Sequence, residues 1–199
     1  MKYLLFPLLL MIAFFTACQS EGTDEVNTKT TTNTNVTPID LTDYQLTPST
    51  NGWQLAERIS EEGEIIRNGY VDSRGFQQGS WTSWEGPRSP SVVENYVDGK
   101  LHGARVEFDP VGRLRKIEHY KMGVLDGRYA EFRAAIPQVT ATYRDGEYHG
   151  TYRAHTLQNG KVNRTIEYRN GKQDGPMRWY NDDEELIQER TYKNGELMD

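Results

Sequence analysis

The amino-acid sequence predicts an all-β fold: an elongated single-layer antiparallel array of β-hairpin repeats, with about five full repeats and a partial one. Three observations lead to this prediction. A pair of glycines recurs about every 24 residues. The chain holds 12 Tyr and 4 Trp, and aromatic residues favour strands. Apolar and polar residues alternate between the glycines, as in strands with one covered face, and no stretch keeps helical spacing.

A leading glycine sets the period of the array, with spacings of 24, 24, 23, 25 and 24 residues. A second glycine follows it by four residues in the first five units, and a tyrosine precedes it by three in five units. The first unit has Asp72 at the tyrosine position. The repeat residues are Gly75, Gly79, Gly99, Gly103, Gly123, Gly127, Gly146, Gly150, Gly171, Gly175, Gly195, Tyr96, Tyr120, Tyr143, Tyr168 and Tyr192. So constant a register indicates a repeat architecture.

Each unit has the pattern of a β-hairpin. Pairs such as Asp98-Gly99 and Asn170-Gly171 predict tight turns, because glycine tolerates positive φ and Asp or Asn nearly does. A strand-like stretch follows the second glycine, as in residues 104–108, and a return strand then runs to the tyrosine, as in residues 114–120. One hairpin is marginal in water, so we expect stacked hairpins to share a core.

A second aromatic position lies five residues after the second glycine. It holds Trp84, Phe108, Phe132, His155 and Tyr180. We expect these side chains and the repeated tyrosines to stack as core ladders. In this register Trp84 is a ladder member and Trp81 faces outward, whereas a register error of one residue would exchange the two roles.

The repeat domain is predicted to span residues 44–199. Near its start, a turn at residues 61–64 joins two strand-like stretches, residues 53–60 and 65–72, in a degenerate hairpin. A truncated closing strand ends the last unit. Atypical end units of this kind are what repeat arrays need to protect their edges.

The N-terminus has the pattern of a secretory signal peptide over residues 1–17. Lys2 precedes an apolar run that is shorter than the roughly 20 residues a membrane span needs. The small residues Thr16 and Ala17 before Cys18 resemble the lipobox of bacterial lipoproteins. The resemblance implies a lipidated Cys18 and a location in the cell envelope, above all the outer membrane, facing the periplasm or the cell surface. The alternative is an ordinary secreted protein with a free Cys.

The segment between Cys18 and the repeats is predicted to be a tether, residues 18–43. Residues 19–38 contain almost nothing apolar and read as a Thr/Asn-rich and acidic stretch. Such a composition cannot bury enough surface to fold, so we expect a disordered spacer.

Composition excludes several functional classes. Removal of residues 1–17 takes the formal net charge from −6 to −7, and an acidic chain is a poor ligand for nucleic acid. Cys18 is the only cysteine, so lipidation would leave no thiol for a disulfide, a metal site or a nucleophile.

No catalytic constellation is evident. His102 and His149 precede the second glycine of their units, where Asp126 and Asp174 stand in others, so a ladder of metal ligands is conceivable. Two strands at about 4.8 Å each would separate successive members, which is too far for one ion. We therefore interpret these positions as turn residues, and predict no metal, no cofactor and no enzymatic activity.

The motif Tyr96-Val-Asp-Gly99-Lys-Leu-His-Gly103, repeated as Tyr168-Arg-Asn-Gly171-Lys-Gln-Asp-Gly175, resembles MORN-type repeats (membrane occupation and recognition nexus). It is most similar to the bacterial variant in YwqK-like antitoxin proteins, over roughly residues 64–199. The resemblance implies a non-enzymatic scaffold that binds proteins or, in some members, lipids. An antitoxin for a cytoplasmic toxin should not be exported, whereas an immunity-like role outside the cytoplasm stays open.

The sequence therefore predicts a tethered binding scaffold with an unknown protein partner. Aromatic residues and Arg are enriched at interfaces. On that ground the candidate binding residues are Trp81, Arg105, Tyr129, Tyr152 and Arg178, with Trp84 as a further candidate. Recognition of envelope glycan or lipid is the alternative, and an envelope hydrolase has the least support.

Overall fold

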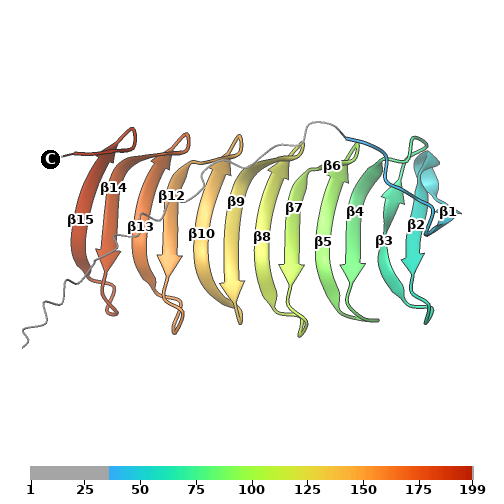
Figure 1. The fold of residues 1–199 in the computed structure, drawn as a ribbon, viewed down its shortest axis with the longest axis horizontal. Coiled ribbons are helices and arrows are strands. Elements are labelled where there is room, and N and C mark those ends of the chain that lie inside the picture. Colours follow the sequence, from blue (N-terminus) through green and yellow to red (C-terminus); the bar gives the residue numbers. More distant parts are fainter. Residues whose placement is uncertain (1–35, 199) are drawn as a thin grey trace, which may run out of the picture.

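The computed structural model describes residues 36–198, which form one open antiparallel sheet of 16 strands. The strands lie side by side in chain order (Figure 1). They are β1 (Tyr44–Pro48), β2 (Gln54–Ile59), β3 (Ile65–Val71), β4 (Gln77–Trp84), β5 (Pro90–Val97), β6 (Lys100–Leu101), β7 (Gly103–Phe108), β8 (Leu114–Lys121), β9 (Val124–Arg133), β10 (Ile136–Arg144), β11 (Glu147–Tyr148), β12 (Gly150–His155), β13 (Val162–Arg169), β14 (Lys172–Tyr180), β15 (Leu186–Lys193) and β16 (Glu196–Leu197), with a 3₁₀ turn η1 (Thr50–Gly52). The predicted all-β hairpin array is confirmed.

The leading glycines close the hairpin turns and also join successive repeats. Asp98 and Gly99 both have positive φ, 48° and 71°, as the predicted tight turn requires. The Gly99 N–H donates to the carbonyl of Gln77, two residues beyond the previous leading glycine, at 2.9 Å. Gly123, Gly146, Gly171 and Gly195 donate to Leu101, Leu125, Tyr148 and Gln173 in the same way. Each turn is therefore hydrogen-bonded to the one before it.

The second glycine of each unit lies opposite the next tyrosine across the sheet. The five pairs are Gly79 with Tyr96, Gly103 with Tyr120, Gly127 with Tyr143, Gly150 with Tyr168 and Gly175 with Tyr192. Directly opposed residues share a face, and a glycine has no side chain to occupy it. All five glycines also have positive φ, from 63° at Gly79 to 132° at Gly175, which explains why glycine recurs at this position.

The register gives the sheet two distinct faces. We call the side with Tyr96, Tyr120, Tyr143, Tyr168 and Tyr192 the tyrosine face. We call the opposite side, with Thr140, Thr142, Thr151 and Thr165, the threonine face. No second layer covers either face over its whole length within residues 36–198.

Two apolar clusters form the core, both on the tyrosine face. The N-terminal cluster contains Ala56, Val71 and Trp81. The C-terminal cluster contains Leu125, Ala141, Tyr143, Tyr148, Tyr152, Ile166 and Tyr168. Within the second cluster the Tyr148 ring lies 4.4 Å from that of Tyr143 and 5.1 Å from that of Tyr168, measured between centroids. Of the predicted ladder tyrosines, Tyr143 and Tyr168 are thus stacked, and they are joined through Tyr148, which is not among the predicted ladder residues.

The predicted roles of Trp81 and Trp84 are exchanged, because the strand register differs by one residue from the predicted one. Trp81 is only 1% exposed, and its ring covers Gly69 so closely that a Cβ there would lie 2.2 Å from it. Trp84 lies on the threonine face, half-buried, where its indole N–H donates to Asn68 Oδ1 at 3.0 Å. Because Gly79 shares a face with Tyr96, the core position is two residues after the second glycine, as in Trp81 and Tyr152, and not five.

The packed domain also begins earlier than the predicted start at Tyr44. Ile39 donates its N–H to the Gly75 carbonyl at 3.2 Å, and Ile39 and Leu41 pack against the N-terminal cluster. This segment runs along the upper turns at the N-terminal end of the sheet (Figure 1). Residues 36–38 are thus not the disordered spacer we expected. The predicted signal peptide, Cys18 and the tether up to residue 35 lie outside the described residues.

The ends of the sheet differ. The predicted degenerate hairpin is present as β2 and β3, and β1 adds an unpredicted strand outside it. At the other end β15 carries only the two-residue β16. None of the helical segments in residues 36–198 has the length and apolar character of a membrane span.

We expect Trp81→Ala to lower the free energy of unfolding by about 3–5 kcal/mol, because it removes the largest buried side chain and leaves a cavity. Trp84→Ala should cost clearly less, since that ring is only half-buried. Urea unfolding of both variants measures the difference. An equal or larger loss for Trp84→Ala would contradict the face assignment.

Candidate binding surfaces

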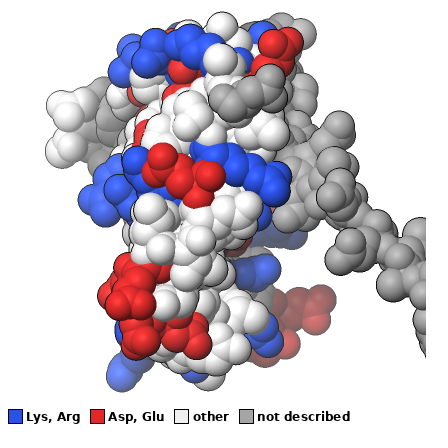
Figure 2. Space-filling model, turned by 90° about the vertical axis from the view of Figure 1, so that its left-hand side faces the viewer, with Lys and Arg blue, Asp and Glu red and all other residues white. Residues whose placement is uncertain are grey.

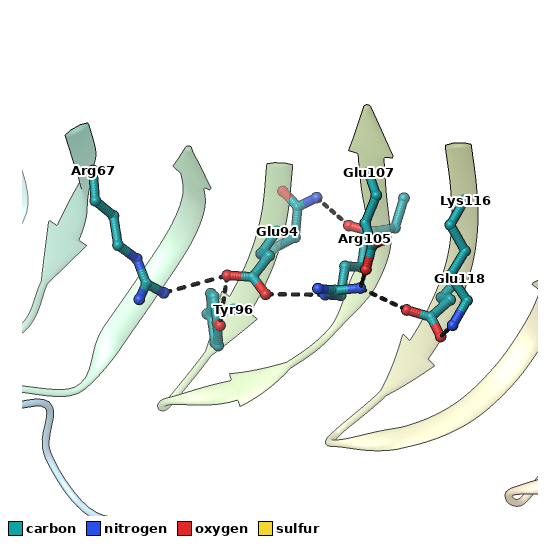
Figure 3. A network of polar contacts seen from close by, with 9 residues as sticks. Arg67, Glu94, Tyr96, Arg105, Glu107, Lys116 and Glu118 are labelled. Atoms are coloured by element: carbon teal, nitrogen blue, oxygen red, sulfur yellow. Dashed lines mark hydrogen bonds and ion pairs between the residues drawn. The ribbon is translucent and has the colours of Figure 1, made fainter. Parts of the chain in front are cut away.

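A chain of ion pairs occupies the middle of the tyrosine face, between the two apolar clusters. It contains three cations and three carboxylates: Arg67, Glu94, Arg105, Glu107, Lys116 and Glu118 (Figure 3). These residues come from β3, β5, β7 and β8, and the register places them on one face. The formal charges of the six side chains balance.

Arg105 is the centre of this ion chain. Its Nε lies 3.1 Å from Glu94 Oε1, its Nη1 lies 2.9 Å from Glu118 Oε2, and it also pairs with Glu107. Glu94 continues to Arg67 at 3.3 Å and accepts the Tyr96 hydroxyl at 3.0 Å. Contact with three carboxylates raises the pKa of Arg105 above its already high ordinary value, against the opposing effect of desolvation.

The ion chain joins the two apolar clusters through its ends. The Arg67 guanidinium lies 5.3 Å from the Trp81 ring centroid, and Lys116 Nζ lies 5.2 Å from that of Tyr129, both within cation–π range. Glu118 is 6% exposed and contacts both Arg105 and Lys116. Because each charge already has a partner, this region serves to hold the sheet together and offers a ligand little unpaired charge.

The predicted binding residues do not form one surface. Trp81 and Tyr152 are buried, at 1% and 8% exposed, so neither can act as an exposed anchor. Tyr129 is half-buried against the C-terminal cluster, and Arg105 is occupied by its three carboxylates. Arg178 and the further candidate Trp84 lie on the threonine face, and Arg178 is 38% exposed and paired with Glu189 at 2.6 Å. The docking role predicted for the first two residues is therefore wrong.

The histidines have local roles. His155 places Nδ1 at 2.9 Å from the Gly160 carbonyl and Nε2 at 3.3 Å from Thr140 Oγ1. His102 Nδ1 lies 3.4 Å from the backbone N of Met122 in the next turn. No group of three or more His, Cys, Asp or Glu side chains within residues 36–198 has the arrangement of a metal site.

A groove that sequence reasoning missed lies on the threonine face and has two parts. One part, of about 310 Å³, is lined by Ile117, Arg128, Tyr129, Ala130, Phe132, Thr140, Ala141, Thr142, Thr151 and Arg153. The other, of about 380 Å³, is lined by Thr151, Arg153, Val162, Thr165, Glu167, Arg178, Tyr180 and Glu184. Thr151 and Arg153 line both parts, so the two parts lie next to each other at these side chains. The signal in the sequence is the Thr and Arg residues that alternate with buried tyrosine-face positions.

The outer edge of β15 is the second open surface. Every β15 residue except Tyr192 is exposed, and the apolar Leu186 and Ile187 are 52% and 65% exposed. Within residues 36–198 only β16 pairs with the outer side of β15, at Tyr192 and Lys193. Figure 2 looks onto this end and shows uncharged atoms between groups of acidic and basic side chains.

Burial changes the acidity of the ladder tyrosines. It raises the pKa of Tyr96 to about 12, and the nearby Glu94 carboxylate contributes. Burial likewise raises the pKa of Tyr120 to about 12, with a further contribution from Glu118. The pKa values of Tyr129, Tyr143 and Tyr168 are raised, with burial as the first cause in each. The folded state therefore favours neutral tyrosines.

Neither a protein-family model nor a curated protein matches this chain.

The raised tyrosine pKa values predict a loss of stability at high pH. Below pH 10.0, which is the ordinary tyrosine pKa, the tyrosines stay protonated in both the folded and the unfolded protein. They therefore give the stability no pH dependence there. Above it the unfolded chain ionises first, so stability should fall from about pH 10 towards about pH 12. Urea unfolding across this range, with tyrosinate absorbance as a second probe, measures it. Tyr120→Phe should reduce the slope, and an unchanged slope would contradict the assignment.

Proposed function

We propose that this protein is a non-enzymatic binding scaffold, anchored in the cell envelope by lipid on Cys18, that docks a protein partner. The observation that supports it most is the outer edge of β15. This edge combines unpaired strand backbone with the exposed apolar side chains Leu186 and Ile187. An edge strand of this kind is a template for another strand.

The internal repeats indicate where the partner strand would pair. Val92 and Val93, which lie four and three residues before the repeated tyrosine Tyr96, pair with β7. The same positions in a later unit, Val139 and Thr140, pair with β12. The corresponding β15 residues are Gln188 and Glu189, which have no described strand on that side. The β15 edge thus presents the site that each internal unit fills with its next strand.

The chemistry of this edge favours a polypeptide partner. A strand edge offers backbone N–H and C=O groups in a fixed register, and another backbone satisfies both kinds at once. Side chains of the added strand would then cover Leu186 and Ile187. Glycans and lipid headgroups supply neither a peptide ladder nor alternating apolar side chains.

The sequence resemblance supports the same proposal. MORN-type repeats are associated with non-enzymatic scaffolds, and the signal-like residues 1–17 with Cys18 direct this one to the envelope. The partner would therefore be met outside the cytoplasm. An immunity-like role, in which the partner is a toxin encountered there, is a special case of this proposal.

We expect a photo-crosslinking amino acid at position 187 of the full-length lipidated protein to capture one defined protein in intact cells. The matched control is position 111, since Val111 is also exposed and apolar, at 72%, but lies in the turn before β8. Mass spectrometry identifies the captured chain. Equal capture at both positions, or capture of lipid and glycan alone, would contradict docking at β15.

The anchor is tested separately. Cys18→Ser should move the protein from the membrane fraction to the soluble fraction, because the acyl chains supply membrane affinity of about 0.8 kcal/mol per buried CH₂. Fractionation with metabolic labelling by a palmitate analogue measures both location and lipid. A labelled or membrane-bound Cys18→Ser variant would reject the lipoprotein assignment.

A further inference from the structure

The part of the threonine-face groove between β8 and β12 has a cationic lining. Its charged lining residues are Arg128 and Arg153, and its lining contains no carboxylate. Both arginines are exposed, and neither guanidinium has an ion pair or hydrogen bond with a side chain of residues 36–198. This contrasts with Arg105 and Arg178, which are paired with glutamates. These two guanidinium groups make this part of the groove locally cationic, although the protein carries a formal net charge of −6.

The positions of the two arginines follow from the register. Arg128 on β9 lies opposite Thr142 of β10, and Arg153 on β12 lies opposite Thr140 of the same strand. The two guanidinium groups therefore flank β10, with their strands about 10 Å apart at the ordinary strand spacing. One ligand chain that crosses β10 can contact both.

The hydroxyl groups of the groove are oriented as acceptors. Thr151 donates its hydroxyl proton to Glu167 at 2.7 Å. His155 contacts the Gly160 carbonyl through Nδ1, which makes Nδ1 the protonated nitrogen and leaves Nε2 to accept from Thr140. Both threonine oxygens, as donors in these bonds, keep lone pairs that can accept, and both residues line the groove. A ligand must bring O–H donors for these oxygens and an anion for the arginines.

We infer that this groove binds an acidic polysaccharide whose sugar residues carry carboxylates. Planar guanidinium groups match carboxylates in bidentate geometry, and sugar hydroxyls supply the donors that the threonines accept. Apolar side chains of Ile117, Ala130 and Phe132 give a surface for the C–H face of a sugar ring. Inorganic phosphate satisfies the arginines but leaves the threonine oxygens without donors.

The open shape fits a polymer. Beyond Arg153 lies the part lined by Thr165, Arg178 and Tyr180, together with the carboxylates of Glu167 and Glu184. Thr165 lies directly opposite both Arg153 and Arg178. The Arg178 guanidinium therefore belongs to a strand two beyond that of Arg153. Because Arg178 is paired with Glu189, the cations available to a ligand are Arg128 and Arg153, about 10 Å apart across β10. This site is separate from the β15 edge, and its occupancy does not depend on the proposed protein partner.

The test is a calorimetric titration of the full-length lipidated protein in detergent with defined oligogalacturonates. The same oligomers as methyl esters remove the charge and keep the hydroxyls. Arg153→Gln should weaken binding about tenfold or more, because it removes a charge-assisted contact. Arg153→Lys should recover only part of the loss, because a lysine has no bidentate fork. Arg88→Gln, at an exposed arginine in the loop before β5, should leave binding unchanged.

Each outcome decides the inference. Binding of the acid form with loss in Arg153→Gln alone supports it. No binding, equal binding of the methyl esters, or equal loss in Arg88→Gln would overturn it. Polyglutamate that binds as tightly as the oligogalacturonate would move the assignment to an acidic protein segment, and phosphate competition at equal concentration would reduce it to a simple anion site. Unchanged melting temperatures of the variants show that folding is not the cause.

Discussion

The fold depends on the opposition of one glycine and one tyrosine across one strand pair in each of five repeat units. The second glycine of a unit lies opposite the next tyrosine and has a positive φ that other residues rarely adopt, as with Gly150 (90°) opposite Tyr168. A single-layer sheet has no second sheet to bury its apolar side chains against. Within the C-terminal cluster the tyrosine rings pack against one another instead, as the Tyr148 ring does against those of Tyr143 and Tyr168. The leading glycines add a hydrogen bond between successive turns, which keeps the stacked units in register.

The tyrosine face is not apolar throughout, and the exception is informative. The repeat position two residues after the second glycine holds Trp81 in one unit and Tyr129 in another. In the unit between them it holds Arg105, which is surrounded by glutamates. Half-buried ions are costly unless their partners are in place, and here Glu94, Glu107 and Glu118 provide them. The long aliphatic stems also continue the packing where a ring is missing. Arg67 and Lys116 then contact Trp81 and Tyr129, so the charged part and the apolar parts form one continuous layer.

This division of the sheet determines where binding can occur. On the tyrosine face the aromatic and charged side chains are largely used by the fold, so residues such as Trp81 and Tyr152 are not free to contact a partner. The threonine face makes little contribution to the two core clusters, and its groove keeps unpaired arginines and hydroxyl acceptors. The β15 edge keeps strand backbone and apolar side chains. The two open surfaces differ in chemistry, which is why we assign them partners of different classes.

The sequence by itself determined the repeat, its hairpin turns and the all-β class, because glycines at positive φ and Asp-Gly or Asn-Gly pairs act locally. It could not determine which alternate residues share a face, because that depends on the pairing between strands. The pairing of Gly79 with Tyr96 places Trp81 in the core and Trp84 outside it, the reverse of the prediction. It also missed the packing of Ile39 and Leu41, whose polar neighbours indicated a spacer. The groove around Arg153 arises only when β9, β10 and β12 lie side by side, so the tertiary structure alone decided it.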